Sequence, residues 1–438
     1  MEIFYVFNII LATALLFWPV WFSRAVLRLE LVNPFTITLI LSLPVQVMKL
    51  FGGPLVLIEE GLFDLGYQFA ILMTNVQIGV QMLSMFLFYN LFRSIRIERH
   101  LPMRLIFLRP IVLRRGAALF LVLFFASFFL LASAEYGVIN WILNPREGYQ
   151  LYRTGQGHWY ALAVSALSVS YLLSFLGKPR PIALLRSTFV HIACAYLLGS
   201  KGIMLAIFGS ALVFLWFLRW RHLGKFLMLG MPPVFCLLLL NLYLALADGF
   251  NLQAVLEYFD YYMNAANYYR EYFSGEIDLF YGDVFLGGVW SYVPRALWPE
   301  KPVVYGILLI NEIFYPGQAE LTNTPAFGGA VEQFADFGVV GVIFFGFFSA
   351  QAVFTALLSY FIFRRPGFDI ERVSLASVLF LTVQYAPAFG TFFPGGLYLL
   401  LLLVVVGLLF LVWLMYPRRR LSDPSNISND FHVEGLNL

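Results

Sequence analysis

The chain has 438 residues, of which 61% are hydrophobic, 18% aromatic and only 12% charged. Soluble domains carry roughly a quarter charged residues and just under half apolar ones. The composition therefore excludes a soluble enzyme, a disordered chain and a disulfide scaffold, and the mean hydropathy of +0.80 agrees. The apolar runs are long and lack period-two alternation, so they predict membrane-spanning helices and not barrel strands.

Eleven apolar runs have the length that a membrane-spanning helix needs. They lie near residues 3–22, 35–52, 68–92, 116–134, 159–177, 183–199, 203–219, 226–247, 337–360, 374–391 and 396–416. The first run has no basic segment before it and no small-residue cleavage site after it, so we expect a retained helix. We predict an all-α polytopic membrane protein with one integral membrane domain over 1–416 and a tail over 417–438.

The basic residues divide unequally between the two sets of loops that this span order creates. One set holds 21 basic and 7 acidic residues, and the other holds 7 basic and 18 acidic residues. Because cytoplasmic loops are enriched in Lys and Arg, the first set is predicted to be cytoplasmic. This orientation places the N-terminus outside, the C-terminus inside, and two larger loops, about 135–158 and 248–336, on the outer face.

The most basic cytoplasmic stretch is 93–115, which carries seven arginines around His100. A nucleic-acid site is one interpretation, but a topology anchor touching anionic lipid is the favoured one. The apolar spans also hold His191, Cys194 and Cys236. We expect a buried, hydrogen-bonded histidine and two small core cysteines, with no disulfide framework or metal site.

The long outward loop begins with a helical pattern rich in tyrosine. Apolar residues recur at three- and four-residue spacing from Leu252 to Ala266, and tyrosines continue through Tyr269 and Tyr272. This pattern predicts an amphipathic helix at the outer membrane boundary. Its rings form either an interfacial aromatic belt, which is the favoured interpretation, or a platform for sugar rings.

A proline-rich run follows in the same loop. Pro294, Pro299 and Pro302 fix an extended backbone that carries Arg295, Trp298 and Lys301. A rigid basic element on an acidic outer face suggests a bound anion.

The long outward loop ends in a glycine-rich segment from Leu321 to Glu332. Glu332 and Asp336 are four residues apart, so both are predicted to lie on one face where the ninth span begins.

The shorter outward loop shares a spacing with the longer one. Arg146 is followed by ten residues and then Gly157, and Arg295 by ten residues and then Gly306.

Lys201 lies between the sixth and seventh spans, in the tight hairpin Gly-Ser-Lys-Gly. It is either a snorkelling interface lysine or a ligand contact.

Four features of the sequence together point to a known family. They are the paired arginine–glycine spacings, the Pro-x-x-Leu-Trp-Pro-x-Lys-Pro run at Pro294, the Thr-Pro-x-x-Gly-Gly and Phe-Gly-x-x-Gly elements at Thr324 and Phe337, and the hairpin lysine. In these features the chain resembles the O-antigen polymerase (Wzy-type) family. That family includes enterobacterial common antigen and exopolysaccharide polymerases. Lys201 stands where such proteins often show arginine, which keeps the charge but not a bidentate phosphate contact.

The resemblance implies a GT-C-like glycosyltransferase of the bacterial cytoplasmic membrane whose active site faces the periplasm. It joins undecaprenyl-pyrophosphate-linked oligosaccharide repeat units and needs no metal or cofactor. Cations would stabilise the leaving pyrophosphate, and a carboxylate or histidine would act as the base. The base is sought among Glu332, Asp336, Asp283 and His158. Substrate contacts are expected from Arg146, Arg153, Lys201, Arg270, Arg295, Lys301, Trp298 and Tyr269, with Arg146 and Arg295 favoured at the pyrophosphate.

Two other functions remain open from the sequence. An O-antigen ligase would share the architecture and transfer to a different acceptor, whereas a lipid-linked oligosaccharide flippase would show repeated halves and polar groups at mid-membrane. The expected partners are lipid-linked glycan as donor and acceptor, membrane lipids, and possible contacts with a chain-length regulator and a flippase. No nucleic acid is expected.

Overall fold

In this computed structural model the residues described are 2–47, 63–96, 110–151, 157–229, 262–290, 298–318 and 327–360, with single residues 50, 58, 232, 293 and 325. All regular elements in these ranges are helices. Five of them are long and apolar enough to cross a membrane. The prediction of an all-α membrane protein is thus confirmed for this part of the chain, whereas eleven spans and their orientation stay a prediction.

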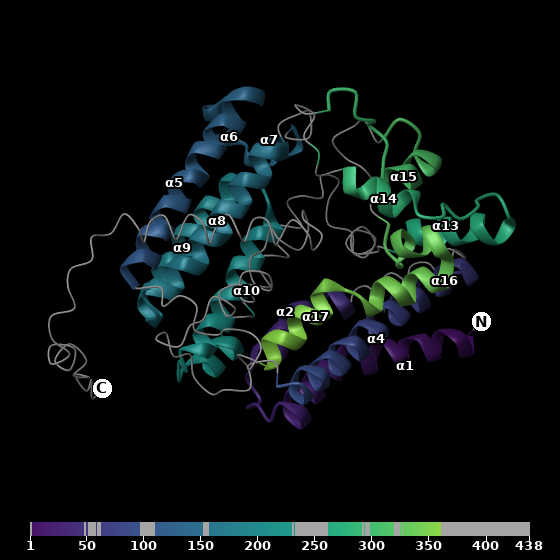
Figure 1. Ribbon diagram of the computed structural model, residues 1–438, viewed down its shortest axis with the longest axis horizontal. Coiled ribbons are helices and arrows are strands. Elements are labelled where there is room, and N and C mark those ends of the chain that lie inside the picture. The colour runs from purple at the N-terminus through teal and green to yellow at the C-terminus, as the bar shows by residue number, and fades with distance from the viewer. Residues whose placement is uncertain are drawn as a thin grey trace.

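Two helical bundles make up the described part of the molecule (Figure 1). The first contains α5 (Pro110–Glu135), α8 (Gly157–Gly177), α9 (Pro181–Leu197) and α10 (Lys201–Phe217). The second contains α1 (Glu2–Trp21), α4 (Leu65–Ser94), α16 (Val331–Phe347) and α17 (Ala350–Leu358). Helix α2 (Pro34–Val47) contacts both α1 and α10 and so connects the bundles.

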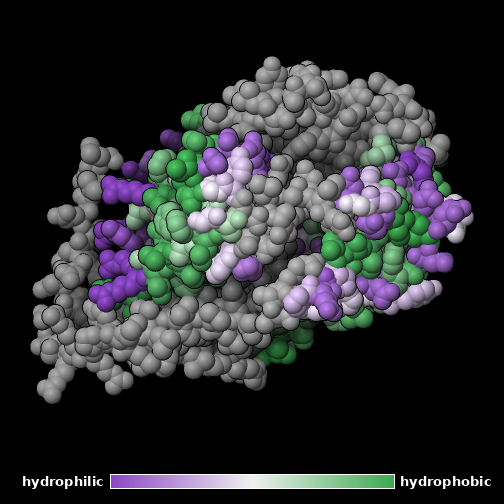
Figure 2. All heavy atoms as spheres, turned by 90° about the horizontal axis from the view of Figure 1, so that it is seen from above, coloured by the Kyte–Doolittle hydropathy of each residue, from purple (hydrophilic) through white to green (hydrophobic). Residues whose placement is uncertain are grey.

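Short elements cover one end of each bundle (Figure 1). Helices α6 (Val138–Leu143) and α7 (Pro145–Leu151) lie at the end of α5, and α13 (Met263–Ser274), α14 (Asp283–Trp290) and α15 (Leu308–Phe314) lie beside the start of α16. We call residues 262–290, 298–318 and 327–336 the loop module. Figure 2 shows the molecule from above, and on this face hydrophobic surface is bordered by hydrophilic residues.

Local sequence explains where the helices start and stop. Asp64 caps α4, because its carboxylate accepts the N–H of Tyr67 at 3.0 Å. The hairpin between α9 and α10 turns through Gly199 at φ +66°, and Ser200 then caps α10. The predicted tight hairpin is therefore confirmed. Helix α1 ends in a π-helical turn (Phe22–Val26), three residues after Pro19, which interrupts the hydrogen-bond ladder.

The first bundle has the expected buried histidine. His191 is 3% exposed, its Nδ1 lies 2.8 Å from the Ser187 carbonyl oxygen, and its Nε2 lies 3.0 Å from Ser170 Oγ. Ser170 in turn donates to the Ala117 carbonyl at 2.9 Å. These bonds connect α9, α8 and α5 by polar contacts that lipid cannot replace. Cys194 is buried as expected, and Cys236 lies outside the described residues.

The predicted spans agree with these helices to different extents. Helices α1, α4 and α8 begin and end close to the predicted limits, and α5 ends close to its limit but begins at Pro110, before the predicted start at 116. Helices α2, α9 and α10 are present but shorter than the other spans, at 14, 17 and 17 residues. The described residues include only the start of the predicted span 226–247 and none of 374–391 or 396–416.

The ninth span is not the continuous helix that the apolar run predicts. It begins at Val331, leaves helical geometry at Phe337 and Gly338, and breaks again at Ser349 before α17. Gly338 has φ +61°, a conformation that side-chain-bearing residues rarely adopt. The first two residues of the Phe-Gly-x-x-Gly element therefore break the helix, which an apolar count along the sequence does not register.

Candidate functional site

The tyrosines of α13 form a packed core in the loop module. Tyr268 and Tyr269 are both 0% exposed, and the Tyr269 ring lies 5.0 Å from that of Phe334 and 4.9 Å from that of Phe69. The Tyr269 hydroxyl donates to the Gly329 carbonyl at 2.5 Å. These rings are neither an interfacial belt nor a sugar platform, because α4 and α16 cover them. The structure thus gives Tyr269 a packing role in place of the predicted substrate contact.

Burial also sets the ionisation of these two phenols. It raises the pKa of Tyr269 well above its ordinary value, with a smaller contribution from Tyr268. Burial raises the pKa of Tyr268 too, with Tyr272 and Asp336 adding to the effect. Both hydroxyls therefore stay protonated at neutral pH, so neither phenol can act as a base there.

Close backbone packing positions the glycine-rich segment before α16. A Cβ at Gly329 would lie 2.7 Å from the Cβ of Ala265 and 3.0 Å from that of Ala70. Gly329 also has φ +63°. Only glycine fits between α13 and α4 at this point, so the Thr-Pro-x-x-Gly-Gly element fixes where α16 begins.

Asp336 caps α14 from a neighbouring helix. The residue is 0% exposed, and its carboxylate accepts the N–H groups of Gly282 and Val284 at 3.0 Å and that of Phe285 at 2.7 Å. These donors are the unpaired groups at the start of α14, which favour a negative charge. The carboxylate that was a candidate base is thus engaged within the protein.

The kink after Asp336 completes this contact. It frees the carbonyls of Ala335 and Asp336, which accept the N–H groups of Phe280 at 2.8 Å and Tyr281 at 3.1 Å. A Cβ at Gly341 would lie 2.2 Å from the Gln333 carbonyl oxygen. The Phe-Gly-x-x-Gly element therefore lets α16 bind the segment that leads into α14.

Glu332 and Asp336 differ in their surroundings although they are one turn apart. Glu332 lies in the first turn of α16 and is exposed, whereas α14 covers Asp336. Spacing placed both residues on one helical face, but it did not indicate that α14 would bury Asp336. Asp283, the first residue of α14, and His158, near the start of α8, are exposed. Glu332, Asp283 and His158 thus remain accessible to a substrate.

Arg270 joins α13 to the start of α4. Its guanidinium forms an ion pair with Asp64 and also donates to Asn267. Partial burial opposes ionisation of Asp64, but the bonds from Arg270 and the Tyr67 N–H outweigh it and lower the pKa of that carboxyl. Gly66 lies against Arg270, since a Cβ there would be 2.9 Å from the arginine Cγ. Arg270 is therefore engaged in holding α13 in place.

Lys301 is folded into its own loop. It is 7% exposed, its Nζ donates to the Val293 carbonyl at 3.2 Å, and it lies 4.6 Å from the centre of the Tyr305 ring. The ring of Trp298 lies 5.6 Å from that of Trp290 at the end of α14. Lys301 and Trp298 thus hold the second half of the proline-rich run in place, and Arg295 itself lies outside the described residues.

Gly306, the second glycine of the paired spacing, lies against α14. A Cβ at Gly287 would be 2.7 Å from the Gly306 nitrogen, and one at Gly306 would be 3.1 Å from the Gly288 Cα. Gly306 also has φ +61°. Gly306 is needed because its backbone lies so close to that of α14. It therefore fixes one end of the loop that contains Arg295.

The first outward loop lies at the end of the other bundle. Trp141 on α6 is fully buried and donates from Nε1 to the carbonyl of Leu197, the last residue of α9, at 2.8 Å. This bond places α6 beside the hairpin at whose end Lys201 begins α10. Arg146 on α7 is exposed. Arg146 and Lys201 thus belong to one end of the first bundle.

The predicted site residues fall into two groups. Arg146, His158 and Lys201 belong to the first bundle, while Asp283, Glu332, Arg270, Lys301 and Trp298 belong to the loop module. Arg153 and Arg295 lie outside the described residues. In the described ranges, no group of three or more His, Cys, Asp or Glu side chains could hold a metal ion.

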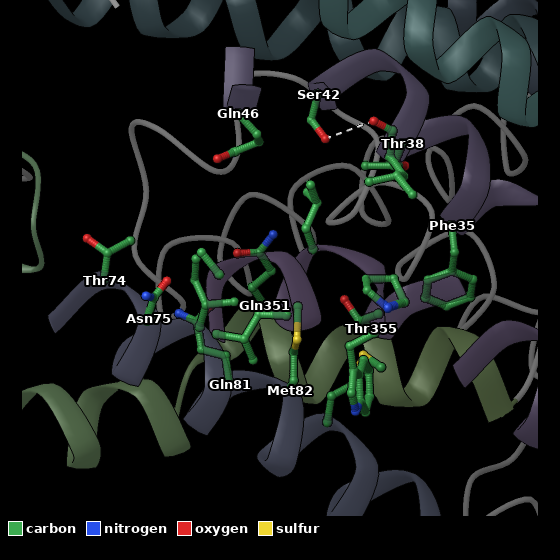
Figure 3. A pocket seen from close by; sticks show the side chains of 18 of the residues that line it. Phe35, Thr38, Ser42, Gln46, Thr74, Asn75, Gln81, Met82, Gln351 and Thr355 are labelled. Carbon is green, nitrogen blue, oxygen red and sulfur yellow. Dashed lines mark hydrogen bonds between the residues drawn. The ribbon is translucent and has the colours of Figure 1, made fainter. Parts of the chain in front are cut away.

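A cavity of about 420 Å³ lies between α1, α2, α4 and α17 (Figure 3). None of the predicted site residues that the structure describes lines it. Its polar lining includes Gln46, Gln81 and Gln351, one from each of three helices, and these side chains are labelled in Figure 3. The sequence did signal them, as glutamines within apolar runs, but a search for charged outward residues passes over them.

Comparisons with known proteins support the resemblance seen in the motifs. Two curated proteins named O-antigen polymerase, from Salmonella typhimurium and Salmonella typhi, are each 29% identical to this chain over 205 residues. The matched region is 46% of this chain. It covers 49% of each relative, so the chain spans about half the length of the curated relatives it matches. No family model and no solved structure matches.

The suspected resemblance to O-antigen polymerases is therefore confirmed. Together with the long apolar helices, it indicates a multi-pass bacterial membrane protein.

Proposed function

We propose that this protein is a glycosyltransferase that joins lipid-linked oligosaccharide repeat units into O-antigen or a related surface polysaccharide. The similarity to the two O-antigen polymerases carries this proposal. The substrates are undecaprenyl-pyrophosphate-linked glycans, and the reaction takes place at the periplasmic face of the cytoplasmic membrane. The unequal distribution of basic residues between the loops supports that orientation.

The proposed reaction has a simple balance of bonds. A hydroxyl oxygen of the acceptor repeat unit attacks the anomeric carbon of the donor glycan, and the bond from that carbon to the pyrophosphate oxygen breaks. The hydroxyl proton passes to a base on the protein, and the lipid pyrophosphate leaves with the bonding electrons. The protein must supply the base and must stabilise the negative charge that develops on the leaving group.

Glu332 is the base that the geometry favours. It is exposed in the first turn of α16, while the neighbouring Asp336 is buried against three backbone N–H groups. The glycine contact at Gly329 and the capping of α14 by Asp336 hold this turn from two sides. A base on a rigid turn stays in place as the sugar hydroxyl approaches. Asp283 and His158 are the alternatives.

Arg146 and Arg295 are the cations assigned to the pyrophosphate, as the paired spacings suggest. Arg146 is exposed on α7, and the turn at Gly306 fixes the end of the loop that contains Arg295. Arg270 and Lys301 are assigned a supporting part, because both hold loop elements in position. Guanidinium groups can bind a phosphate through two parallel hydrogen bonds, which suits a leaving pyrophosphate.

The decisive test uses purified protein in vesicles with a lipid-pyrophosphate-linked repeat unit. We expect a ladder of products that lengthens with time. Glu332→Gln should lower the rate by about 10²- to 10⁴-fold, the usual contribution of a general base. Glu276→Gln is the matched control, because Glu276 is exposed in the same module and has no assigned role.

Each failure has a distinct meaning. A wild-type protein that transfers glycan only to a different acceptor lipid would identify a ligase, and one that moves the lipid-linked unit across the vesicle without lengthening it would identify a flippase. A normal ladder from Glu332→Gln would remove Glu332 as the base and leave the polymerase assignment intact.

A further inference from the structure

The cavity between α1, α2, α4 and α17 combines an apolar wall with uncharged polar groups (Figure 3). Leu15, Leu39, Ile78 and Met82 are among its apolar residues. Among the described residues that line it, none is Lys, Arg, His, Asp or Glu. An anionic group such as a pyrophosphate would find no compensating charge on these described residues.

Three of the hydroxyl groups in the lining already donate their protons. Thr38 donates to the Pro34 carbonyl at 2.9 Å, Ser42 to the Leu39 carbonyl at 3.2 Å, and Thr74 to the Ala70 carbonyl at 3.0 Å. Asn75 likewise donates to the carbonyl of Asn8 at 3.1 Å. These groups can still accept hydrogen bonds, but they offer few free protons to a ligand.

The three glutamines differ from these groups. Gln46 on α2, Gln81 on α4 and Gln351 on α17 border the cavity, and their amides form no hydrogen bond within the described part of the chain. Gln46 and Gln81 are half-buried and Gln351 is exposed, so their amides can reach a ligand, and leaving an amide unpaired is costly wherever lipid excludes water from it. Three such amides around one cavity therefore point to a ligand with carbonyl and hydroxyl oxygens.

The cavity is long in the direction of α4. Its lining on that helix runs from Thr74 to Met85, which is about 16 Å at the rise of an α-helix. Its volume lies within the range of small-molecule sites. The shape and the apolar wall suit a lipid chain, while the glutamines require oxygen atoms along it. A plain isoprenoid chain has none and would leave the amides unpaired.

We propose that this cavity binds the ester-bearing glycerol region of a neutral diacylglycerol lipid. The glutamine amide N–H groups donate to the ester carbonyls, and a glutamine carbonyl accepts the free glycerol hydroxyl. The acyl chains lie along the apolar wall and extend into the surrounding membrane. The described residues that line this cavity include neither Glu332 nor Arg146, and the proposal does not depend on the assignment of glycan transfer.

The test uses the full-length protein in vesicles of a diether phosphatidylcholine, which has no ester carbonyls. The probe is a diacylglycerol with a diazirine in one acyl chain. After irradiation, we expect cross-linked peptides from α4 around 74–85 and from α17 around 351–355. Unlabelled dioleoylglycerol should displace the probe. Undecaprenol, which lacks ester groups, and diacyl phosphatidylglycerol, which adds an anionic head, should not.

Variants test the role of the amides. Gln81→Leu combined with Gln351→Leu should lower the yield of cross-linked product about tenfold, as expected when two hydrogen bonds are lost. Gln77→Leu is the matched control on α4, because Gln77 does not border the cavity. If the double variant does not fold, the competition on wild-type protein still decides the question. Cross-links elsewhere, or equal displacement by undecaprenol or phosphatidylglycerol, would overturn the proposal.

Discussion

Asp336 Oδ1 on α16 accepts the backbone N–H of Val284 on α14 at 3.0 Å. The contact joins an element of the loop module to the first helical segment of a candidate membrane span. It combines a helix cap with a buried charge that three N–H groups satisfy. This carboxylate, together with the backbone bonds from Phe280 and Tyr281, therefore holds the start of α14 against α16.

Asp336→Asn should destabilise the protein. An asparagine amide keeps one acceptor oxygen but turns an NH₂ group toward backbone donors, so at least one buried N–H loses its partner. The expected cost is about 1–3 kcal/mol, measured as a lower midpoint of thermal unfolding in detergent. Asp283→Asn, at an exposed carboxylate one residue before Val284, should change the midpoint little. Equal effects of the two substitutions would contradict the capping role.

Two adjacent glycines in α14 offer a matched pair. Gly287→Ala places a Cβ 2.7 Å from the Gly306 nitrogen, whereas a Cβ at Gly288 has no atom within 4 Å. Gly287→Ala should push the turn at Gly306 away from α14 and increase proteolysis of the loop. Gly288→Ala should be neutral or raise stability by up to about 1 kcal/mol through helix propensity. The comparison fails if both variants show the same cleavage rate.

The ion pair between Asp64 and Arg270 predicts a pH dependence. Because the folded-state pKa of Asp64 lies below the ordinary 3.8, its stabilisation is present above that value and is lost as the pH falls through the folded-state pKa. Asp64→Asn keeps the helix cap and removes the ion pair. The free energy of unfolding of this variant, measured by thermal unfolding in detergent, should therefore lie slightly below that of the wild type at pH 7 and pH 5. The difference should be at most about 1 kcal/mol. The two proteins should converge as the pH falls below the folded-state pKa of Asp64. A gap that widens in acid would show the opposite linkage.

Charge reversal should separate the proposed pyrophosphate contacts from topology anchors. Arg146→Glu, and likewise Arg295→Glu, should abolish long-chain polymer in cells while single repeat units remain attached to the surface lipid. Arg186→Glu, at an exposed arginine on α9 predicted to face the cytoplasm, should leave the polymer length unchanged. Unchanged polymer in Arg146→Glu at normal protein levels would remove that contact from the mechanism.

The predicted orientation can be checked by cysteine accessibility. In a variant whose native cysteines are replaced, Glu276→Cys in the loop module should react with a membrane-impermeant maleimide added to intact spheroplasts. Arg221→Cys, after α10, should react only after the membrane is permeabilised. The reverse pattern would invert the topology and move the proposed site to the cytoplasm.

The sequence by itself determined the class of protein and the main helices. Runs of apolar residues about 20 long are a local property, so α1, α4, α5 and α8 could be located from hydropathy alone. The hairpin before Lys201 could also be found, because glycine at a positive φ and a serine cap act within a few residues. Motif resemblance indicated the O-antigen polymerases, and similarity to two of them confirmed it.

Only the tertiary structure decided which site residues are accessible. Glu332 and Asp336 are equivalent by spacing, but α14 packs across one of them and leaves the other exposed. The tyrosines of α13 have the pattern of a surface belt, but α4 and α16 cover Tyr269. Likewise, Gln46, Gln81 and Gln351 border one cavity although they are far apart in the chain. Burial depends on contacts between segments distant in sequence, and no local pattern records which segment will cover a given side chain.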